Sequence, residues 1–275
     1  MGIISRNMNA TPLDGRHVAA VRKFLNDDPI ANVFLIGVFE RFGVAPVHGG
    51  AWWACFNAER GIDALLYSSP KRADGFAQVA AVAGDATAGF ALGIALKEAG
   101  GAAWVVGERA AADSLWSGMG NPAARVRSDQ ILMQAVSVKD GPLLDVRAAE
   151  LADAPWVLQA SLSMSREDLG VEEPGALRPD RALVGEVVAV HQSRRVYRAK
   201  VTTECSAGAQ VGGLWVEPDC RGRGLGQAAT RALVGGLLSS HPRVTLHVRT
   251  DNPAAIRCYE AVGFQAERDF RVLVR

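Results

Sequence analysis

The sequence has little cysteine, little aromatic content and almost no net charge. Of its 275 residues, four are cysteine and 7% are aromatic, and the formal net charge at pH 7 is +1. This balance gives no electrostatic reason to expect a nucleic-acid partner or an anionic membrane surface. The four cysteines are widely spaced and form no C-x-x-C motif, which favours free thiols in a reducing cytoplasm. We therefore expect neither disulfides nor a metal site.

Long hydrophobic runs are also missing. No apolar run reaches the roughly 18 residues that a membrane helix needs, and Ile3-Ile4 is far too short for the apolar region of a signal peptide. Hydrophobic residues nevertheless make up 49% of the chain, which is enough for a core. The length suits one large domain or two small ones. The expectation is a cytoplasmic globular protein with no membrane partner.

One stretch, Leu214 to Gly226, reads LWVEPDCRGRGLG and is central to the prediction. Its first three residues favour a strand, and Pro218 ends that strand because proline offers no ladder donor. Helical spacing of apolar residues begins at Leu225. The glycines thus stand at a helix N-terminus, where about four backbone N–H groups are unpaired and carry partial positive charge. Glycine allows a phosphate to approach the main chain closely, and arginine adds charge and donors.

Three kinds of phosphate loop have similar glycine patterns. The P-loop needs G-x-x-x-x-G-K-[ST], and no Lys-Ser or Lys-Thr pair is present here. The dinucleotide fingerprint G-x-G-x-x-G fails because Gln227 stands where its third glycine belongs. The pattern [RQ]-x-x-G-x-[GA] matches Arg221, Gly224 and Gly226 without exception. On this short motif alone, a plain glycine-rich turn remains the alternative.

A second motif lies downstream. Val244 to Arg249 alternates apolar and polar residues and predicts a strand. Asn252 is a good helix N-cap, Pro253 suits the first helical position, and Gly263 is a good helix stop. The motif N-x-x-A-x-x-x-Y-x-x-x-G-F is matched by Asn252, Ala255, Tyr259, Gly263 and Phe264.

Together the two motifs resemble the GNAT superfamily of coenzyme A-dependent N-acetyltransferases over roughly residues 143–275. The resemblance implies an α/β (α+β) GNAT fold, with a mixed, mostly antiparallel sheet flanked by helices, and acetyl-CoA as cosubstrate. A bulge at Gly212-Gly213 would separate two strands so that the pantetheine arm pairs with exposed main chain. The implied cofactor-binding residues are Leu214, Trp215 and Val216 for pantetheine, Arg221, Gly222, Arg223, Gly224, Leu225, Gly226 and Gln227 for the pyrophosphate, and Asn252.

The chemistry requires a neutral amine, although most amines are protonated at pH 7, so a base or a water chain must take a proton. Tyr259 stands at the family's general-acid position, with a core tyrosine as the alternative. His247 occupies the place of a glutamate base in ribosomal-protein acetyltransferases and is expected on the polar face of its strand, although a lone histidine on a strand is more often structural. Glu217 is a second candidate base, and ordered water is a third possibility. Cys220 and Cys258 are interpreted as packing residues.

The N-terminal half has a strand–strand–helix–strand–helix–strand pattern after an initial helical region at residues 14–42. We expect an α+β domain over residues 1–140, a linker at Val138–Pro142, and the acetyltransferase domain over 143–275. The order resembles a GNAT half without its phosphate loop, because Ala83–Gly93 contains glycines but no arginine. A degenerate, non-binding copy and an unrelated α+β domain both remain open. Uncharacterised two-part GNAT proteins have an N-terminal segment that resembles Asp28–Phe34 of this chain.

Within the C-terminal half, an acidic loop is predicted over Ser163 to Pro174. In the family this region lines the acceptor pocket, so its carboxylates could attract a cationic amine, although a solvated loop is the alternative. Asp180 to His191 is predicted to form a second helix, and Arg195 to Cys205 to form two strands without an obvious turn. The carboxylates in question are Glu167, Asp168, Glu172 and Glu173.

The sequence therefore predicts an N-acyltransferase that moves an acetyl group from acetyl-CoA to a primary amine by direct attack in a ternary complex. The expected partners are acetyl-CoA and an amine acceptor, which is a small molecule or a protein amine, with no nucleic acid and no membrane. The protein would act as a monomer or homodimer. A catalytically silent acyl-CoA sensor or scaffold is the alternative function, and a nucleotide-dependent enzyme using the glycine loop is a third.

Overall fold

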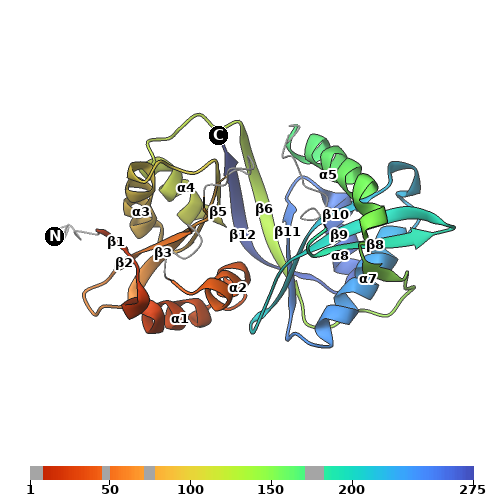
Figure 1. Cartoon of the computed structure of the whole chain (residues 1–275), viewed down its shortest axis with the longest axis horizontal. Coiled ribbons are helices and arrows are strands. Elements are labelled where there is room, and N and C mark those ends of the chain that lie inside the picture. Colours follow the sequence, from red (N-terminus) through yellow and green to blue (C-terminus); the bar gives the residue numbers. More distant parts are fainter. Residues whose placement is uncertain (1–8, 45–49, 71–77, 171–182) are drawn as a thin grey trace. The chain divides into compact units, whose positions relative to one another are not determined.

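A computed structural model describes residues 9–44, 50–70, 78–170 and 183–275 (Figure 1). The chain divides into two compact units: unit 1 is Met1–Gln130 with Arg268–Arg275, and unit 2 is Ile131–Glu267. Each unit combines a mixed sheet with helices, as expected for an α+β fold. Within the described ranges, the helices are too short or too polar to span a membrane.

The division between the units does not follow the linker expected at Val138–Pro142. Instead the boundary falls within one strand near residue 130, and the last eight residues return to unit 1. The segment expected to be a linker is fastened to unit 2 by hydrogen bonds. Arg231 donates through Nε to the Lys139 carbonyl at 2.9 Å and through Nη1 to the Pro142 carbonyl at 2.8 Å.

Unit 1 contains a sheet with the strand order β1-β2-β3-β4-β5-β12. The pairs are antiparallel except for β4 and β5, which run parallel. Its elements are β1 (Ala10–Pro12), α1 (Val18–Asp27), α2 (Val33–Phe42), β2 (Ala51–Phe56), β3 (Ile62–Ser68), β4 (Val79–Gly84), α3 (Ala86–Glu98), β5 (Trp104–Glu108), α4 (Arg109–Gly118) and the C-terminal part of β12 (Gln265–Val274).

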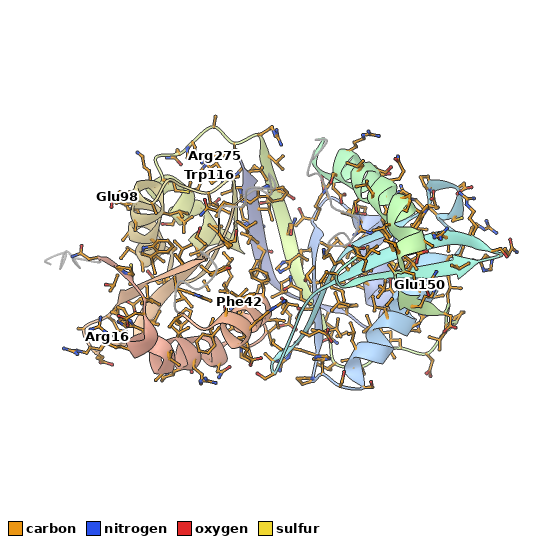
Figure 2. The ribbon with its side chains drawn as sticks, in the orientation of Figure 1. Arg16, Phe42, Glu98, Trp116, Glu150 and Arg275 are labelled. Atoms are coloured by element: carbon orange, nitrogen blue, oxygen red, sulfur yellow. The ribbon has the colours of Figure 1, made fainter. Side chains whose placement is uncertain are left out.

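The core of unit 1 lies where α3 and α4 pack on these strands (Figure 1). Small residues let the two helices approach closely: a Cβ on Gly93 would lie 2.1 Å from the Leu115 carbonyl oxygen. Trp116, on α4 in Figure 2, is buried and donates its indole N–H to the Pro122 carbonyl at 3.0 Å. Asn32, the N-cap residue of α2, is buried and donates its side-chain N–H to the Leu25 carbonyl at 3.3 Å.

Unit 2 contains a sheet with the order β6-β11-β10-β9-β8-β7. Strands β7 to β10 pair antiparallel, and β10 pairs parallel with β11. Its elements are β6 (Val126–Ala135, shared with unit 1), β7 (Val146–Ala148), α5 (Ala154–Leu169), β8 (Glu186–His191), β9 (Arg194–Cys205), β10 (Gly208–Val216), α7 (Leu225–Leu238), β11 (Val244–Arg249) and α8 (Pro253–Val262).

Three sequence-based predictions about unit 2 were wrong. The helix predicted over Asp180 to His191 is strand β8 from Glu186 onward, which fits its run of β-branched valines. Its turn to β9 is Gln192-Ser193, with φ values of 50° and 62°, so Arg194 to Cys205 is a single strand rather than two. The loop predicted to begin at Ser163 is helical to Leu169, where Gly170 in the left-handed region ends α5. The part of these predictions on residues 171–182 lies outside the described residues.

The core of unit 2 brings together the sheet, α7 and α8. Tyr197 on β9 is fully buried, and its hydroxyl lies 3.2 Å from the Thr230 hydroxyl on α7. Side chains alternate along a strand, so Arg198, which follows Tyr197 on β9, points to the opposite face of the sheet. That face is covered by α5. This two-sided covering by helices positions the loop between β10 and α7 at the edge where β10 and β11 end.

Candidate active site

The two parallel strands of unit 2 separate. The register of β10 with β11 pairs Ala209 with Val244 and Gln210 with Thr245, and it ends there although both strands continue. A bulge follows between Gly212 and Trp215, which confirms the irregularity expected from the paired glycines. Gly213 has φ +59°, a conformation that L side chains rarely adopt. The main chain from Leu214 to Val216 is therefore left without a register partner on the β11 side.

The glycine-rich segment leads into the open end of α7. Gly222 and Gly224 have φ of 73° and 79°, and a Cβ at either position would meet nothing within 4 Å, so backbone conformation rather than space requires glycine. Gly224 is the N-cap of α7 and offers no side chain to its first-turn N–H groups. Those groups, with the partial positive charge of the helix end, face the glycine-rich segment and fit a pyrophosphate.

Arg221 is already held by several contacts. Its Nε donates to the Val216 carbonyl at 2.9 Å, and its Nη2 donates to both oxygens of Glu167 at 3.0 and 2.9 Å. Its guanidinium also lies 5.7 Å from the centre of the Trp215 ring. Both partners of the Glu167 ion pair are more than 40% exposed, so the pair is weak and an entering phosphate could displace it.

The acidic end of α5 is bound by arginines. Arg249, at the end of β11, donates through Nη1 to the Asp168 carbonyl at 2.5 Å and through Nε to Asp251 at 2.8 Å. Burial raises the pKa of Asp168, and the nearby Arg249 partly opposes that shift. The sequence-based suggestion that Glu167 and Asp168 attract a cationic amine is therefore weakened, because each carboxylate is paired with an arginine. Glu172 and Glu173 lie outside the described residues.

Helix α8 positions Tyr259. The Asn252 side chain caps this helix by accepting from the Ala255 N–H at 3.1 Å, and Gly263 ends it, as predicted. Tyr259 is 8% exposed and packs edge-on against Phe264 with ring centres 5.9 Å apart. It belongs to the hydrophobic cluster that includes Leu214, Val216 and Leu225. Burial first, and then nearby Tyr197, raises the pKa of Tyr259, so its hydroxyl stays protonated at neutral pH.

His247, the first candidate base, lies on β11 between buried neighbours. The strand face expected to be polar is largely covered, since Thr245 on the same face is fully buried. Desolvation lowers the pKa of His247 to about 4. The imidazole is therefore neutral at pH 7, but it is a weaker base than a histidine in water.

Glu217, the second candidate base, directly follows β10. Its Oε1 accepts from the Trp156 indole N–H at 2.7 Å, and its Oε2 lies 3.8 Å from Arg194 Nη2. Trp156, on α5, also packs edge-on against Trp215 with ring centres 6.1 Å apart. These contacts hold the Glu217 carboxylate between α5 and β9.

The sequence analysis missed one buried ionic pair in the same unit. Arg198 on β9 and Glu186 on β8 form it, and both side chains are less than 5% exposed. The signal was hidden because Glu186 had been assigned to a helix. In the part of the chain that the structure describes, no group of three or more His, Cys, Asp or Glu side chains could hold a metal ion.

Comparisons with known proteins place this geometry in context. Residues 152–264 match the family model described as the acetyltransferase (GNAT) family. A curated relative, mycothiol acetyltransferase of Mycobacterium avium (strain 104), is 29% identical over 157 residues, which are 54% of this chain and 44% of the relative. The chain thus spans less than half the length of the curated relatives it matches.

Solved structures resemble both units together. A Drosophila protein of known structure aligns with a TM-score of 0.67 at 11% identity over 98% of this chain and 99% of its own. A tandem GNAT protein from the clavulanic acid biosynthesis pathway aligns with a TM-score of 0.53 at 16% identity, covering 98% of each chain. At these identities the likeness shows the fold, and it is consistent with two GNAT-like halves.

Proposed function

On the premise that residues 152–264 form a GNAT-family acetyltransferase domain, we propose that this chain transfers an acetyl group from acetyl-CoA to a primary amine by direct attack in a ternary complex. One observation carries the proposal: α7 begins after a glycine N-cap that offers its N–H groups no side chain, and the loop before it follows a strand that separates from its parallel neighbour. A helix N-terminus binds an anion such as a pyrophosphate, and an unpaired strand edge accepts an extended chain such as pantetheine.

In this proposal the pyrophosphate binds the main-chain N–H groups from Gly222 to Gln227. Arg221 and Arg223 add positive charge, since both side chains lie in exposed loop positions. The pantetheine arm pairs with the main chain of Leu214, Trp215 and Val216, as an added strand would. Asn252 caps α8 and so holds the helix that carries Tyr259.

Tyr259 would assist the departing thiolate. Its raised pKa keeps the phenol protonated, so it can donate a hydrogen bond. A thiol with a pKa of about 8.5 is more acidic than this buried phenol, so complete proton transfer from Tyr259 would be uphill. We therefore propose hydrogen-bond donation to the thiolate as its role, while main-chain N–H groups of β10 stabilise the oxyanion.

Neither of the two candidate bases, Glu217 and His247, is poised to deprotonate the amine. Glu217 is bound by Trp156 and Arg194, and the pKa of His247 is lowered to about 4. We propose that the acceptor reacts from its neutral form, with water taking the proton and His247 able to accept a hydrogen bond. The rate would then follow the fraction of neutral amine.

Calorimetry with acetyl-CoA, followed by thiol release against a panel of amines, tests the proposal. We expect one acetyl-CoA per chain and turnover with at least one amine. Tyr259→Phe should lower kcat roughly 100-fold, because a positioned acid or donor contributes about 10²- to 10⁴-fold, and should leave the acetyl-CoA Kd unchanged. Absence of any binding heat would overturn the function entirely.

A catalytically silent acyl-CoA sensor is the second candidate, and it is favoured by the lowered pKa of His247 and by the contacts that hold Glu217. It predicts binding of acetyl-CoA, no thiol release with any amine, and no change in Tyr259→Phe. The names of the curated relatives support the acetyltransferase rather than the sensor. Because the chain covers 44% of the first of them, we carry over the reaction class and not mycothiol-related chemistry.

A further inference from the structure

Two buried N–H donors on neighbouring strands of unit 2 have no acceptor among the described residues. They are Nη1 of Arg198 on β9 and the indole Nε1 of Trp215 on β10. The two residues are direct partners in the antiparallel register, so their side chains leave the same face of the sheet with Cβ atoms about 5 Å apart. Trp215 is 7% exposed and the Arg198 side chain 4%.

The guanidinium of Arg198 is fixed in place rather than loosely buried. Its Nε donates to Glu186 Oε2 at 3.0 Å, and its Nη2 donates to Glu186 Oε1 at 2.7 Å. This fork leaves Nη1 as the nitrogen that faces away from the carboxylate. Lys200 Nζ also lies 3.9 Å from Glu186, so two cations surround one buried carboxylate.

The backbone bulge of β10 lies close beside this guanidinium. A Cβ on Gly213 would lie 3.2 Å from Arg198 Nη2, and the residue's positive φ favours glycine. Because Tyr197 faces α7, Arg198 faces the α5 side, where Trp156 of α5 packs against the Trp215 ring. Both donors therefore lie at the bulge, on the α5 face of the segment proposed to hold the acyl carrier.

Buried donors without acceptors are rare in native proteins, because losing hydration without gaining a partner costs free energy, and a charged donor costs more. Neither nitrogen can accept a hydrogen bond. A ligand that satisfies both must therefore be an acceptor, and the excess positive charge favours an anion. A carboxylate meets these requirements and suits a guanidinium in geometry and charge.

We propose that Arg198 Nη1 and Trp215 Nε1 bind a carboxylate carried by one of the two substrates. The group belongs either to the amine acceptor, which is then an amino acid or a related amino-carboxylate, or to a dicarboxylic acyl chain. This inference rests on the proposed function, since it names the substrate class of that same site. A charge-assisted hydrogen bond to a buried donor is worth roughly 10- to 100-fold in kcat/KM between a carboxylate and its neutral amide.

Paired substrates test the proposal and separate the two sources. Thiol release is measured with acetyl-CoA and each of the amino acids, alongside their carboxamides. It is then measured with succinyl-CoA and acetyl-CoA against the carboxamides alone. A preference for amino acids of about 10-fold or more assigns the carboxylate to the acceptor, and a similar preference for succinyl-CoA assigns it to the acyl chain. Equal kcat/KM values within both pairs would overturn the inference.

Two variants connect the preference to these donors. Trp215→Phe keeps an aromatic ring and removes the indole N–H, and Arg198→Lys keeps a cation for Glu186 and removes Nη1. Each should reduce the carboxylate-to-amide ratio about 10-fold. Trp156→Phe is the matched control, because its indole N–H is already bonded to Glu217, and its ratio should stay at the wild-type value. A ratio that fell equally in Trp156→Phe would contradict the assignment.

A second readout does not require turnover. In protein with ¹⁵N-labelled tryptophan, the indole signal that disappears in Trp215→Phe is titrated with succinyl-CoA, and with the amino acids in the presence of coenzyme A. We expect it to shift with a carboxylate ligand and not with the matching amide. If acetyl-CoA binds but this signal never responds, the inference fails and the proposed function stands. If no coenzyme A thioester binds, the proposed function itself fails.

Discussion

The two units contain the same strand–helix–strand arrangement, built in opposite ways at the helix N-terminus. In unit 1, a single residue, Asp85, joins β4 to α3, and its carboxylate accepts from the Ala88 N–H at 3.0 Å. In unit 2, the eight residues Glu217 to Gly224 join β10 to α7, and the N-cap is a glycine without a side-chain bond. One helix end is closed by a negative charge and the other is left open.

The parallel strand pairs of the two units also differ, since one pair stays together and the other separates. β4 and β5 stay in register over four consecutive pairs, from Val79 with Trp104 to Val82 with Gly107. β10 and β11 keep two pairs, and then β10 bulges and continues paired with β9 but not with β11. Two strands that stay paired leave no free main-chain groups between them for an added chain. Two strands that separate leave such groups exposed. From this comparison we propose that unit 1 is the degenerate copy that does not bind the acyl carrier, one of the two alternatives that the sequence left open.

The largest expected effect comes from giving the helix N-terminus of unit 2 the aspartate cap that unit 1 has. Gly224→Asp places a carboxylate at the N-cap of α7, where it would repel a pyrophosphate and occupy the first-turn N–H groups. Asp tolerates positive φ better than most residues. We expect the acetyl-CoA Kd, measured by calorimetry, to rise roughly 100-fold. Gly224→Asn is the neutral control, and a loss as large as that of Asp would show that backbone strain rather than charge is responsible.

A smaller effect is expected from the cation that unit 1 lacks. Arg221→Ala removes a guanidinium that can reach a phosphate, and a charge-assisted hydrogen bond is worth about 1.5 kcal/mol or more. The acetyl-CoA Kd should therefore rise about 10-fold. Glu167→Gln tests the competing ion pair: it should leave the Kd unchanged or lower it slightly. Weaker binding in Glu167→Gln would mean that the pair supports the site rather than competing with the phosphate.

A third substitution tests whether unit 1 binds acetyl-CoA. Asp85→Ala removes the cap of α3 and should lower the free energy of unfolding by about 1 kcal/mol. It should leave the acetyl-CoA Kd and the stoichiometry of one per chain unchanged, as checked by calorimetry. Asp85→Asn keeps the cap and should restore most of the stability. A second molecule of acetyl-CoA bound by wild type and lost in Asp85→Ala would contradict the degenerate-copy proposal.

The smallest effect concerns β11, which carries His247 whereas β5 carries no titratable ring. The pKa of His247 is about 4 in the folded protein and about 6.5 in an unfolded chain. Protonation therefore favours unfolding, and stability falls as pH drops below about 6.5 toward 4. His247→Gln should show a smaller decrease of Tm over that range. The acid limb of kcat/KM near neutral pH should stay the same, and its disappearance in His247→Gln would restore histidine as the base.

The local motifs of the C-terminal half were predictable because they depend on short-range rules. Gly224 at positive φ, the Asn252 cap and the Gly263 stop each follow from the conformational preference of one residue type. β8 was mistaken for a helix because Glu186, a good helix former, is held in a strand by its buried partner Arg198. The helix propensity of one residue carries no information about a partner 12 residues away in the chain.

The sequence by itself determined the glycine-rich loop, the caps of α8 and the family resemblance, because these are written in consecutive residues. Only the folded structure shows that Glu217 is bound by Trp156 and that the pKa of His247 is low. It also brought Arg198 beside Trp215. The physical reason is that burial and cross-strand pairing depend on segments distant in the chain, whereas φ preferences and capping do not.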